Sequence, residues 1–224
     1  TNIGTSWTFT TSAPSNFPIG SQVVINLPSS GIVNQTYSVS THTDTTFTIT
    51  KNGTFVLNSA QTIVYSNDNG QTWLRASPQN LGGSQSTWGN GVFVCASNSP
   101  VYSTDNGQTW NSSTSVLTGG WNPIGFGNGV FVMAGYDYLN ISQAYSLDNG
   151  RTWTRVVSPL TPLGGHWFSF AYGNGIFVMI GPNDQAYSTN GQTWTRVTSP
   201  LSGAWSGVSF GNGVFVMVGT NCQA

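Results

Sequence analysis

Carboxyl groups, which many hydrolases use for catalysis, are scarce in this chain. Glu does not occur, and Asp is present at six of the 224 positions. Asp68, Asp105 and Asp148 stand before Asn-Gly in a repeated stretch and are expected to be structural. A glycosidase needs two carboxyl groups about 5 to 10 Å apart across the bond it cleaves. Asp137 and Asp184 are the candidate pair for that chemistry, and either could also contribute oxygen ligands to a Ca²⁺ ion.

The other reactive side chains are not spaced for catalysis. His42 and His166 lie far apart in the sequence, no Ser stands in a nucleophile-elbow motif, and no metal-ligand spacing occurs. We therefore predict no catalytic residues, no cofactor and no bound metal ion. Cys95 holds the position that Met133 has in a later repeat, so we expect it in the core, and a bridge to Cys222 stays open.

Aromatic side chains, unlike carboxyl groups, are frequent in this chain. Aromatic residues make up 13% of the chain and charged residues 5%. A concave aromatic site can cover the apolar C–H patches of a sugar while a few polar groups fix its hydroxyls. The candidate ligand-binding residues are Trp121, Tyr136, Asp137, Tyr138, His166, Trp167, Asn183, Asp184, Trp205 and Asn221. For the three tryptophans, a core position is the alternative.

The charge balance argues against several classes of partner. The formal net charge is −1, which provides no basic surface for phosphates, so nucleic acid is not expected. No apolar run approaches the roughly 20 residues of a membrane helix. A surface of Ser, Thr, Asn, Gln and Gly is common in extracellular and virion fibre proteins, and we expect one of these locations.

Two repeated motifs must position these side chains. The first reads Ser-x-Asp-Asn-Gly-x-Thr-Trp at 66–73, 103–110 and 146–153, and a shortened copy without the Asp stands at 188–194. The second reads Gly-Asn-Gly-Val/Ile-Phe-Val and begins at residues 89, 127, 173 and 211. The tryptophans of the first motif are 37, 43 and 41 residues apart. A period near forty with short strands is typical of a propeller or an array.

Each motif predicts a tight turn between strands. Asp-Asn-Gly is a turn signal, because the Asp side chain accepts hydrogen bonds from nearby backbone amides and Gly takes positive φ without steric cost. Gly-Asn-Gly before Val-Phe-Val predicts a hairpin that leads into a buried strand. Each repeat therefore supplies about four strands, the number in one propeller blade.

The first motif resembles the Asp-box, or bacterial neuraminidase repeat. The resemblance implies an all-β propeller in which each box forms the turn between the third and fourth strands of a blade, away from active sites. The family includes sialidases, other glycosidases, lectin-like proteins and sortilin-type receptors. The residues matched to the box are Ser66, Asp68, Gly70, Thr72, Trp73, Ser103, Asp105, Gly107, Thr109, Trp110, Ser146, Asp148, Gly150, Thr152, Trp153, Ser188, Gly191, Thr193 and Trp194.

Residues 59–224 are expected to form a propeller of four blades. This region begins with the third and fourth strands of a blade. It ends with the first and second strands of a blade, at 206–210 and 214–218. Joining the two half-blades would complete a fourth blade and leave no open edge strand. A longer parent protein is the alternative. Four aromatic residues before the second motif are expected between blades: Trp88, Phe126, Tyr172 and Phe210.

Residues 1–58 carry neither motif and are expected to form a small β attachment module. Its strand candidates are residues 22–27, 36–39, 45–50 and 54–57. The stretch from Phe17 to Thr50 resembles a small module of bacteriophage tail and virion proteins, with the general form G-x-x-V-x-I, N-x-x-Y-x-V and T-T-F-x-I. The resemblance implies attachment to a particle.

The residues present argue against a sialidase. That family uses a cluster of arginines for the substrate carboxylate and a Tyr activated by a Glu. Glu is absent here, and Arg75, Arg155 and Arg196 follow the boxes on outer strands, where we do not expect them to converge. We therefore predict that the protein is not an enzyme.

The predicted function is receptor binding by a phage tail fibre or related virion appendage. The propeller would bind a host surface glycan or receptor on its loop face, and the N-terminal module would bind other virion or fibre subunits; a homo-oligomer stays open. One alternative is a structural decoration or assembly protein of a virion or extracellular fibre. Another is a secreted bacterial lectin or glycosidase.

Overall fold

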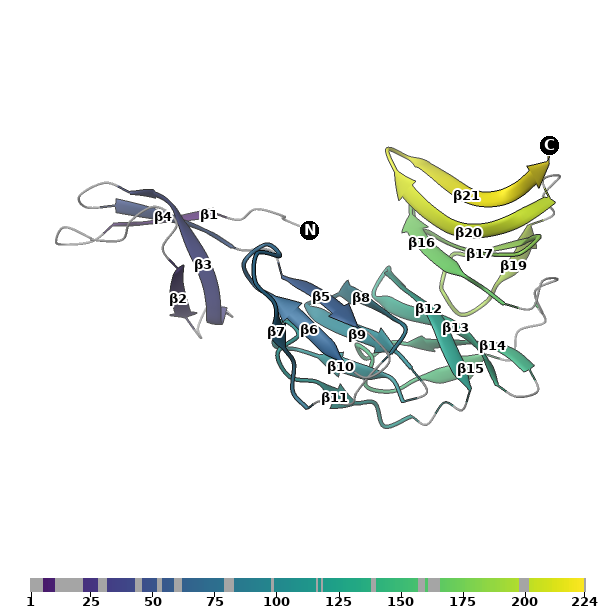
Figure 1. Ribbon diagram of the computed structural model, residues 1–224, viewed down its shortest axis with the longest axis horizontal. Helices are drawn as coiled ribbons and strands as arrows, with labels where there is room; N and C mark the ends of the chain where they lie inside the picture. The colour runs from purple at the N-terminus through teal and green to yellow at the C-terminus, as the bar shows by residue number, and fades with distance from the viewer. Residues whose placement is uncertain are drawn as a thin grey trace. The chain divides into compact units, whose positions relative to one another are not determined.

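The protein is all-β, as the sequence predicted: every element of the described residues is a strand (Figure 1). The computed structural model divides into two compact units, residues 1–55 with 66–73 and residues 56–65 with 74–224. The predicted domain limits, 1–58 and 59–224, stay a prediction. The described residues are 6–10, 22–27, 32–42, 46–51, 54–58, 62–78, 83–97, 99–115, 117, 119–137, 140–156, 160, 166–197 and 202–223.

The first unit contains one antiparallel sheet of four strands, ordered β1-β4-β3-β2. Its strands are β1 (Ser6–Thr10), β2 (Gln22–Leu27), β3 (Ile32–His42) and β4 (Thr46–Lys51). The three strands predicted at 22–27, 36–39 and 45–50 fall on β2, β3 and β4. Nothing in this sheet tests the resemblance to a phage tail module.

Three four-stranded antiparallel meanders form the centre of the second unit. Blade A contains β8 (Gln85–Gly89), β9 (Val92–Ala96), β10 (Val101–Ser103) and β11 (Asn111–Ser112). Blade B contains β12 (Gly120–Gly127), β13 (Val130–Asp137), β14 (Asn140–Ser146) and β15 (Thr154–Val156). Blade C contains β16 (Ser169–Gly173), β17 (Ile176–Gly181), β18 (Asp184–Ser188) and β19 (Thr195–Val197).

Two incomplete sheets stand before and after these blades in the chain. The N-terminal sheet contains β5 (Phe55–Asn58), β6 (Ile63–Ser66) and β7 (Leu74–Arg75), and the C-terminal sheet contains β20 (Ser202–Gly211) and β21 (Val214–Gln223). The predicted joining of these half-blades is not confirmed, because they are separate sheets in this structure. The reason is β5, which pairs with β6 on the edge that β21 would need. The count of four blades is not confirmed.

The Gly-Asn-Gly motifs form the predicted two-residue hairpins. Asn90, Asn128, Asn174 and Asn212 have φ between 45° and 49°, and the glycine after each has φ between 77° and 80°. Positive φ at both central residues defines a type I′ turn, whose twist matches that of the flanking strands. The registers agree, since Gly89 pairs with Val92 and Gly127 with Val130 across the turn.

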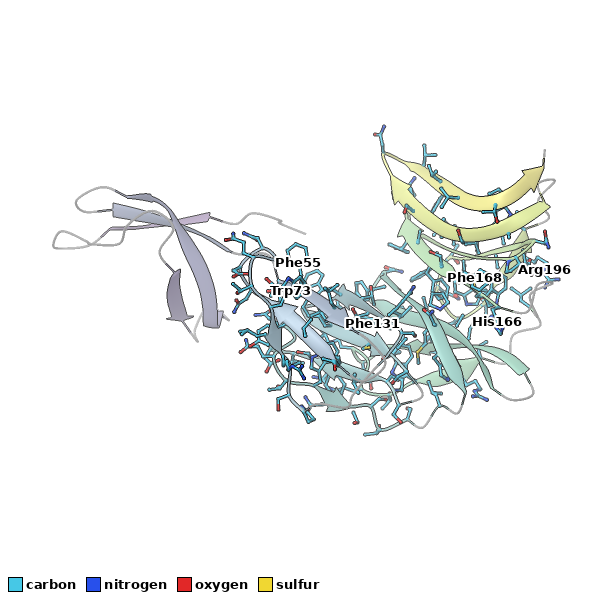
Figure 2. All side chains as sticks on the ribbon, in the orientation of Figure 1. Phe55, Trp73, Phe131, His166, Phe168 and Arg196 are labelled. Carbon is cyan, nitrogen blue, oxygen red and sulfur yellow. The ribbon has the colours of Figure 1, made fainter. Side chains whose placement is uncertain are left out.

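Neighbouring blades are held together by alternate side chains of their second strands. Val92, Val94 and Ala96 of blade A pack against Phe131 and Met133 of blade B, and the Asp-box Trp153 joins the same cluster. Figure 2 shows Phe131 within this core. The pattern recurs between blades B and C, between the N-terminal sheet and blade A, and between blade C and the C-terminal sheet. The hydrophobic core therefore lies between sheets.

The first glycine of each hairpin motif gives room for an aromatic ring of the next sheet. A Cβ atom on Gly89, Gly127 or Gly173 would overlap the ring of Phe126, Tyr172 or Phe210, respectively. These three aromatic residues therefore lie between blades, as predicted. Trp88 does not lie between blades as predicted: it is 48% exposed.

Each complete Asp-box is a closed hydrogen-bond network. In the second box, the Ser103 hydroxyl donates to Asp105 at 2.8 Å and accepts from the Gly107 amide at 2.9 Å. Asp105 also accepts from the amide and the hydroxyl of Thr109, at 2.9 and 2.5 Å. The indole of Trp110 donates to the Gly107 carbonyl at 2.9 Å. Boxes one and three repeat these bonds, so the polar side chains of each complete box bond within its own turn.

The shortened fourth box uses an amide in place of the carboxylate. The Asn190 side-chain oxygen accepts from the Thr193 amide at 2.9 Å and from its hydroxyl at 3.2 Å. The Ser188 hydroxyl still accepts from the Gly191 amide at 2.8 Å. Among the described residues, the indole nitrogen of Trp194 has no hydrogen-bond partner. The shorter box therefore lacks the tryptophan hydrogen bond, but it still forms the turn.

Hydrogen bonding lowers the pKa of the box carboxylates. For Asp68, the hydroxyl of Thr72 is the main cause, followed by the Thr72 amide and the Ser66 hydroxyl, and the pKa falls from 3.8 to about 2. For Asp105 and Asp148, burial raises the pKa, but bonds from Thr109 and Thr152 outweigh it and the net shift is downward. The folded state therefore prefers the ionised boxes.

We expect acid to destabilise the protein through these boxes. A carboxyl group whose pKa is lower in the folded state contributes stability above its unfolded pKa and loses it as the pH falls through the folded value. The free energy of unfolding should decrease between about pH 4 and pH 2. Urea unfolding at pH 6, 4, 3 and 2 measures it. A variant with Asn at positions 68, 105 and 148 is the control, and an equally steep acid loss in that variant would contradict the assignment.

Gly127→Ala should destabilise the fold by about 1 to 3 kcal/mol, since the new methyl group must displace the ring of Tyr172. Gly211→Ala is the matched control, because a Cβ at this position meets no atom within 4 Å. Chemical unfolding of both variants beside the wild type makes the comparison. Equal losses in the two variants would show that the ring does not depend on the glycine.

Candidate functional site

The tryptophans of the predicted loop face lie at one end of the sheets. Trp121 pairs with Gly135 and Trp205 with Gly219, near the far ends of β13 and β21. In blade C, the amide of Phe168 donates to the carbonyl of Ile180 at 2.7 Å, one residue before the β17–β18 turn. The tryptophans and the turns after the second strands therefore share an end, and the Asp-boxes occupy the opposite end.

The three tryptophans of this end are not open to a ligand. Trp121, Trp167 and Trp205 are all buried between sheets, and each belongs to an inter-blade cluster. Their rings therefore offer no free face for stacking on a sugar, and the core alternative describes their positions. Among the described residues, the indole nitrogens of Trp167 and Trp205 have no hydrogen-bond partner.

Asp184 forms a buried ion pair with Arg196. The two side chains are 3.1 Å apart, and 2% of the Asp184 side chain is exposed. Arg196 lies in the outer strand β19 and reaches Asp184 in the neighbouring strand β18. A carboxylate held in this way is a structural group rather than an open acid or base. The side chain of Asp137 lies outside the described residues, so its distance from Asp184 is not defined.

The arginines reach further inward than the sequence analysis predicted. The guanidinium of Arg155 lies over the ring of Trp121, 5.5 Å from its centroid. Arg155 and Arg196 both stand two residues after a box tryptophan. The Arg155 side chain reaches Trp121 in the first strand of blade B, and that of Arg196 reaches Asp184 in the neighbouring strand of blade C. The shared spacing was visible in the sequence, but the length of the side chains was not taken into account.

Asn183 holds blade C to the C-terminal sheet. Its φ is 54°, so it forms the left-handed position of the tight β17–β18 turn. The Asn183 amide donates to the carbonyl of Gly203 at 2.9 Å, and its side-chain oxygen accepts from the Gly203 amide at 3.0 Å. The backbone amide and the side-chain oxygen of Asn183 therefore both form hydrogen bonds within the fold.

His166 and Phe168, like Asn183, are exposed at the loop end of blade C. They flank the buried Trp167, and Phe168 is 41% exposed. Figure 2 shows both side chains, and that of Arg196, at blade C. The corresponding residues after Trp121 and Trp205 are Asn122 and Ser206, which are also exposed. Phe168 was missed because no aromatic residue repeats at this position.

The remaining candidates cannot be placed in the site. Tyr136 and Asp137 end β13, and Asn221 lies in β21, but their side chains lie outside the described residues, as does Tyr138. Within the part of the chain that the structure describes, no group of three His, Cys, Asp or Glu side chains could hold a metal ion. The same residues include no helix long and apolar enough to cross a membrane.

Comparison with known proteins supports the fold. Residues 101–112 match the BNR/Asp-box repeat, and no curated protein matches the sequence. YCF48 bound to D1 peptide is 16% identical, with a TM-score of 0.53 over 98% of this chain. YCF48 from Cyanidioschyzon merolae is 14% identical, with a TM-score of 0.49 over 89%. An ancestral GH74 enzyme is 18% identical, with a TM-score of 0.51 over 84%.

The repeat match and the two structures with TM-scores of 0.53 and 0.51 indicate an Asp-box β-propeller fold. The chain spans 64%, 63% and 25% of the lengths of the three matched proteins, and at these identities the likeness shows the fold alone. The prediction that the protein is not an enzyme is corrected by this result. A GH74 enzyme shares the fold, so the boxes and the arrangement of strands do not separate this chain from glycoside hydrolases.

The ion pair between Asp184 and Arg196 should give a measurable coupling free energy in a double-mutant cycle. We expect Asp184→Asn and Arg196→Gln each to destabilise the fold, and the double variant to lose about 0.5 to 3 kcal/mol less than the sum. Arg155→Gln, which leaves this pair intact, is the control and should show additive losses with Asp184→Asn. Additivity between positions 184 and 196 in urea unfolding would contradict the ion pair.

Proposed function

We propose that this propeller recognises a host surface glycan at the loop end of blade C, as part of a phage tail fibre or related virion appendage. The observation that carries the proposal is the exposed pair His166 and Phe168, which lies at the same end of the blade as Arg196. An aromatic ring can cover the apolar face of a sugar, while imidazole and guanidinium groups hydrogen bond to hydroxyls.

The surface chemistry supports a neutral or weakly charged ligand. Charged residues make up 5% of the chain, and the residues beside the loop end, Asn122 and Ser206 among them, carry amides and hydroxyls. Such groups match sugar hydroxyls as donors and acceptors. A highly charged polymer would instead require a cluster of opposite charge.

The proposed function also includes attachment of the propeller to a virus particle or fibre. The N-terminal module would join the propeller to other virion or fibre subunits, which places the protein in a virion or outside the cell. The second candidate function is structural decoration or assembly of a virion or extracellular fibre. The exposed apolar residues of the end sheets favour this candidate, because such surfaces mark protein contacts.

Phe168→Ala should abolish glycan binding without changing the fold. Its ring is exposed, so its loss removes a stacking surface and little core packing. The measurement is a glycan-array screen of the wild type and the variant at equal concentration. Leu147→Ala is the matched control, since Leu147 is an exposed apolar residue in the Asp-box of blade B, at the opposite end, and it should bind like the wild type.

Two outcomes would change the proposal. If the wild type binds no glycan on the array and no host envelope preparation, the assembly function is favoured. If binding persists in Phe168→Ala, recognition occurs elsewhere on the molecule. Reducing sugar released from a bound glycan would show that binding is coupled to hydrolysis, and the same Phe168→Ala variant should then lose both properties.

A further inference from the structure

The junction between blades B and C contains buried polar side chains near its loop end. Gln143 of β14 pairs with Ala134 of β13, and Ala134 belongs to the cluster between the two blades. Residues paired across antiparallel strands project from the same face of the sheet, so Gln143 projects from blade B into this junction. Trp167 joins the same cluster from blade C. Gln143 is 1% exposed and Trp167 is 3% exposed.

The polar atoms of these two side chains require a partner. Among the described residues, the oxygen and the nitrogen of the Gln143 carboxamide and the indole nitrogen of Trp167 form no hydrogen bond. A buried polar group in this condition has given up its bonds to bulk water without replacing them, which is costly. In folded proteins such groups are nearly always paired with protein or with an ordered water molecule. The two side chains therefore indicate a small ligand that both donates and accepts hydrogen bonds.

The surroundings of Gln143 favour water over an apolar ligand. Arg196 pairs with Ala186, which lies in the same inter-blade cluster, so Arg196 belongs to the face of blade C that meets this junction. Asp184 stands two residues before Ala186 on β18, which puts it on the same face, and it forms the ion pair with Arg196 at 3.1 Å. Polar sites with several hydrogen-bonding groups hold water, whereas apolar sites stay dry.

The same two residue types recur between blade C and the C-terminal sheet. Gln185 pairs with Ile180, and Ile180 shares a cluster with Trp205. Gln185 is 4% exposed and Trp205 is 5% exposed. Within the part of the chain that the structure describes, the side-chain nitrogen of Gln185 and the indole nitrogen of Trp205 form no hydrogen bond. The recurrence ties these polar atoms to a position in the repeat rather than to the orientation of one side chain.

The junction between blades A and B has a different residue at the position of the glutamine. Pro100-Val101-Tyr102-Ser103 aligns with Gln143-Ala144-Tyr145-Ser146, so Pro100 replaces Gln143. A proline side chain has no polar atom. In this junction the guanidinium of Arg155 lies over the ring of Trp121. The glutamine and tryptophan pair is therefore a property of the two later junctions.

We propose that each of these two junctions binds an internal water molecule between the glutamine and the tryptophan. In the B–C junction, the water accepts a hydrogen bond from the Trp167 indole and bonds to the carboxamide of Gln143. In the next junction, the water accepts from the indole of Trp205 and from the side-chain nitrogen of Gln185. Each water molecule joins two neighbouring sheets near the loop end and satisfies polar atoms that both sheets bury.

The first test detects water at the indole protons. In NMR spectra of the isotope-labelled protein, the Hε1 protons of Trp167 and Trp205 should show cross-peaks to water with opposite signs in NOESY and ROESY, which separates bound water from proton exchange. Trp110 is the matched control, because its buried indole donates to the Gly107 carbonyl at 2.9 Å, and it should show no such cross-peak. A missing cross-peak at Trp167 or Trp205, or an equal one at Trp110, would overturn the proposal.

The second test assigns each water molecule to its glutamine. Gln143→Met replaces the carboxamide with an unbranched apolar group that adapts to its surroundings. The water cross-peak of Trp167 should disappear in this variant, and that of Trp205 should remain. Gln185→Met should have the reverse effect. A Trp167 cross-peak that persists unchanged in Gln143→Met would show that the glutamine does not hold the water molecule.

Urea unfolding gives an independent result, because the two possible states of Gln143 predict opposite signs. If water bridges Gln143 and Trp167, Gln143→Met should lower the free energy of unfolding. If the carboxamide is instead buried dry, methionine removes an unpaired polar group and should raise it, which would contradict the bridge. Gln143→Met combined with Trp167→Phe should lose less than the sum of the single losses. The control combination, Gln143→Met with Trp205→Phe, should be additive, and additivity in both combinations would also contradict the bridge.

Discussion

The packing of a valine face against a phenylalanine and tryptophan face is the interaction on which this fold depends. Strands within a sheet are joined by hydrogen bonds, but the buried apolar surface lies between sheets. A single blade would expose both of its faces to water, so no blade is expected to fold alone. The glycines of the hairpins serve the same interaction, because they let an aromatic ring approach the backbone of the preceding blade.

Local sequence signals predicted the features that arise within a few residues. Asp-Asn-Gly and Asn-Gly gave the correct turns, since positive φ and short-range hydrogen bonds are properties of those residues themselves. Three four-stranded blades followed from the spacing. The pairing of β5 with β6 was not predicted, because Asn52-Gly53-Thr54-Phe55-Val56 matches the hairpin motif only loosely. This pairing occupies the edge of β6 that the predicted joining of the half-blades requires.

The candidate site could be predicted less well, for a physical reason. Burial in a propeller depends on the neighbouring blade, which a repeat motif does not describe. Trp121, Trp167 and Trp205 were correctly placed at the loop end, yet the adjacent sheets bury them. Asp184 was identified as a rare carboxylate, but its partner Arg196 reaches it from the outer strand. Phe168 belongs to no motif, so no sequence pattern distinguishes it.

Cys95 gives the first inter-blade interface a chemical reporter of its own. Its side chain lies in the cluster shared by the N-terminal sheet and blade A, and burial raises its thiol pKa to about 12. The thiolate is the reactive form of cysteine, so this residue stays inert while the two sheets are together. In a repeat array each junction opens with its own free energy. Reactivity at Cys95 therefore reports the fluctuation of one junction, separately from unfolding of the whole array.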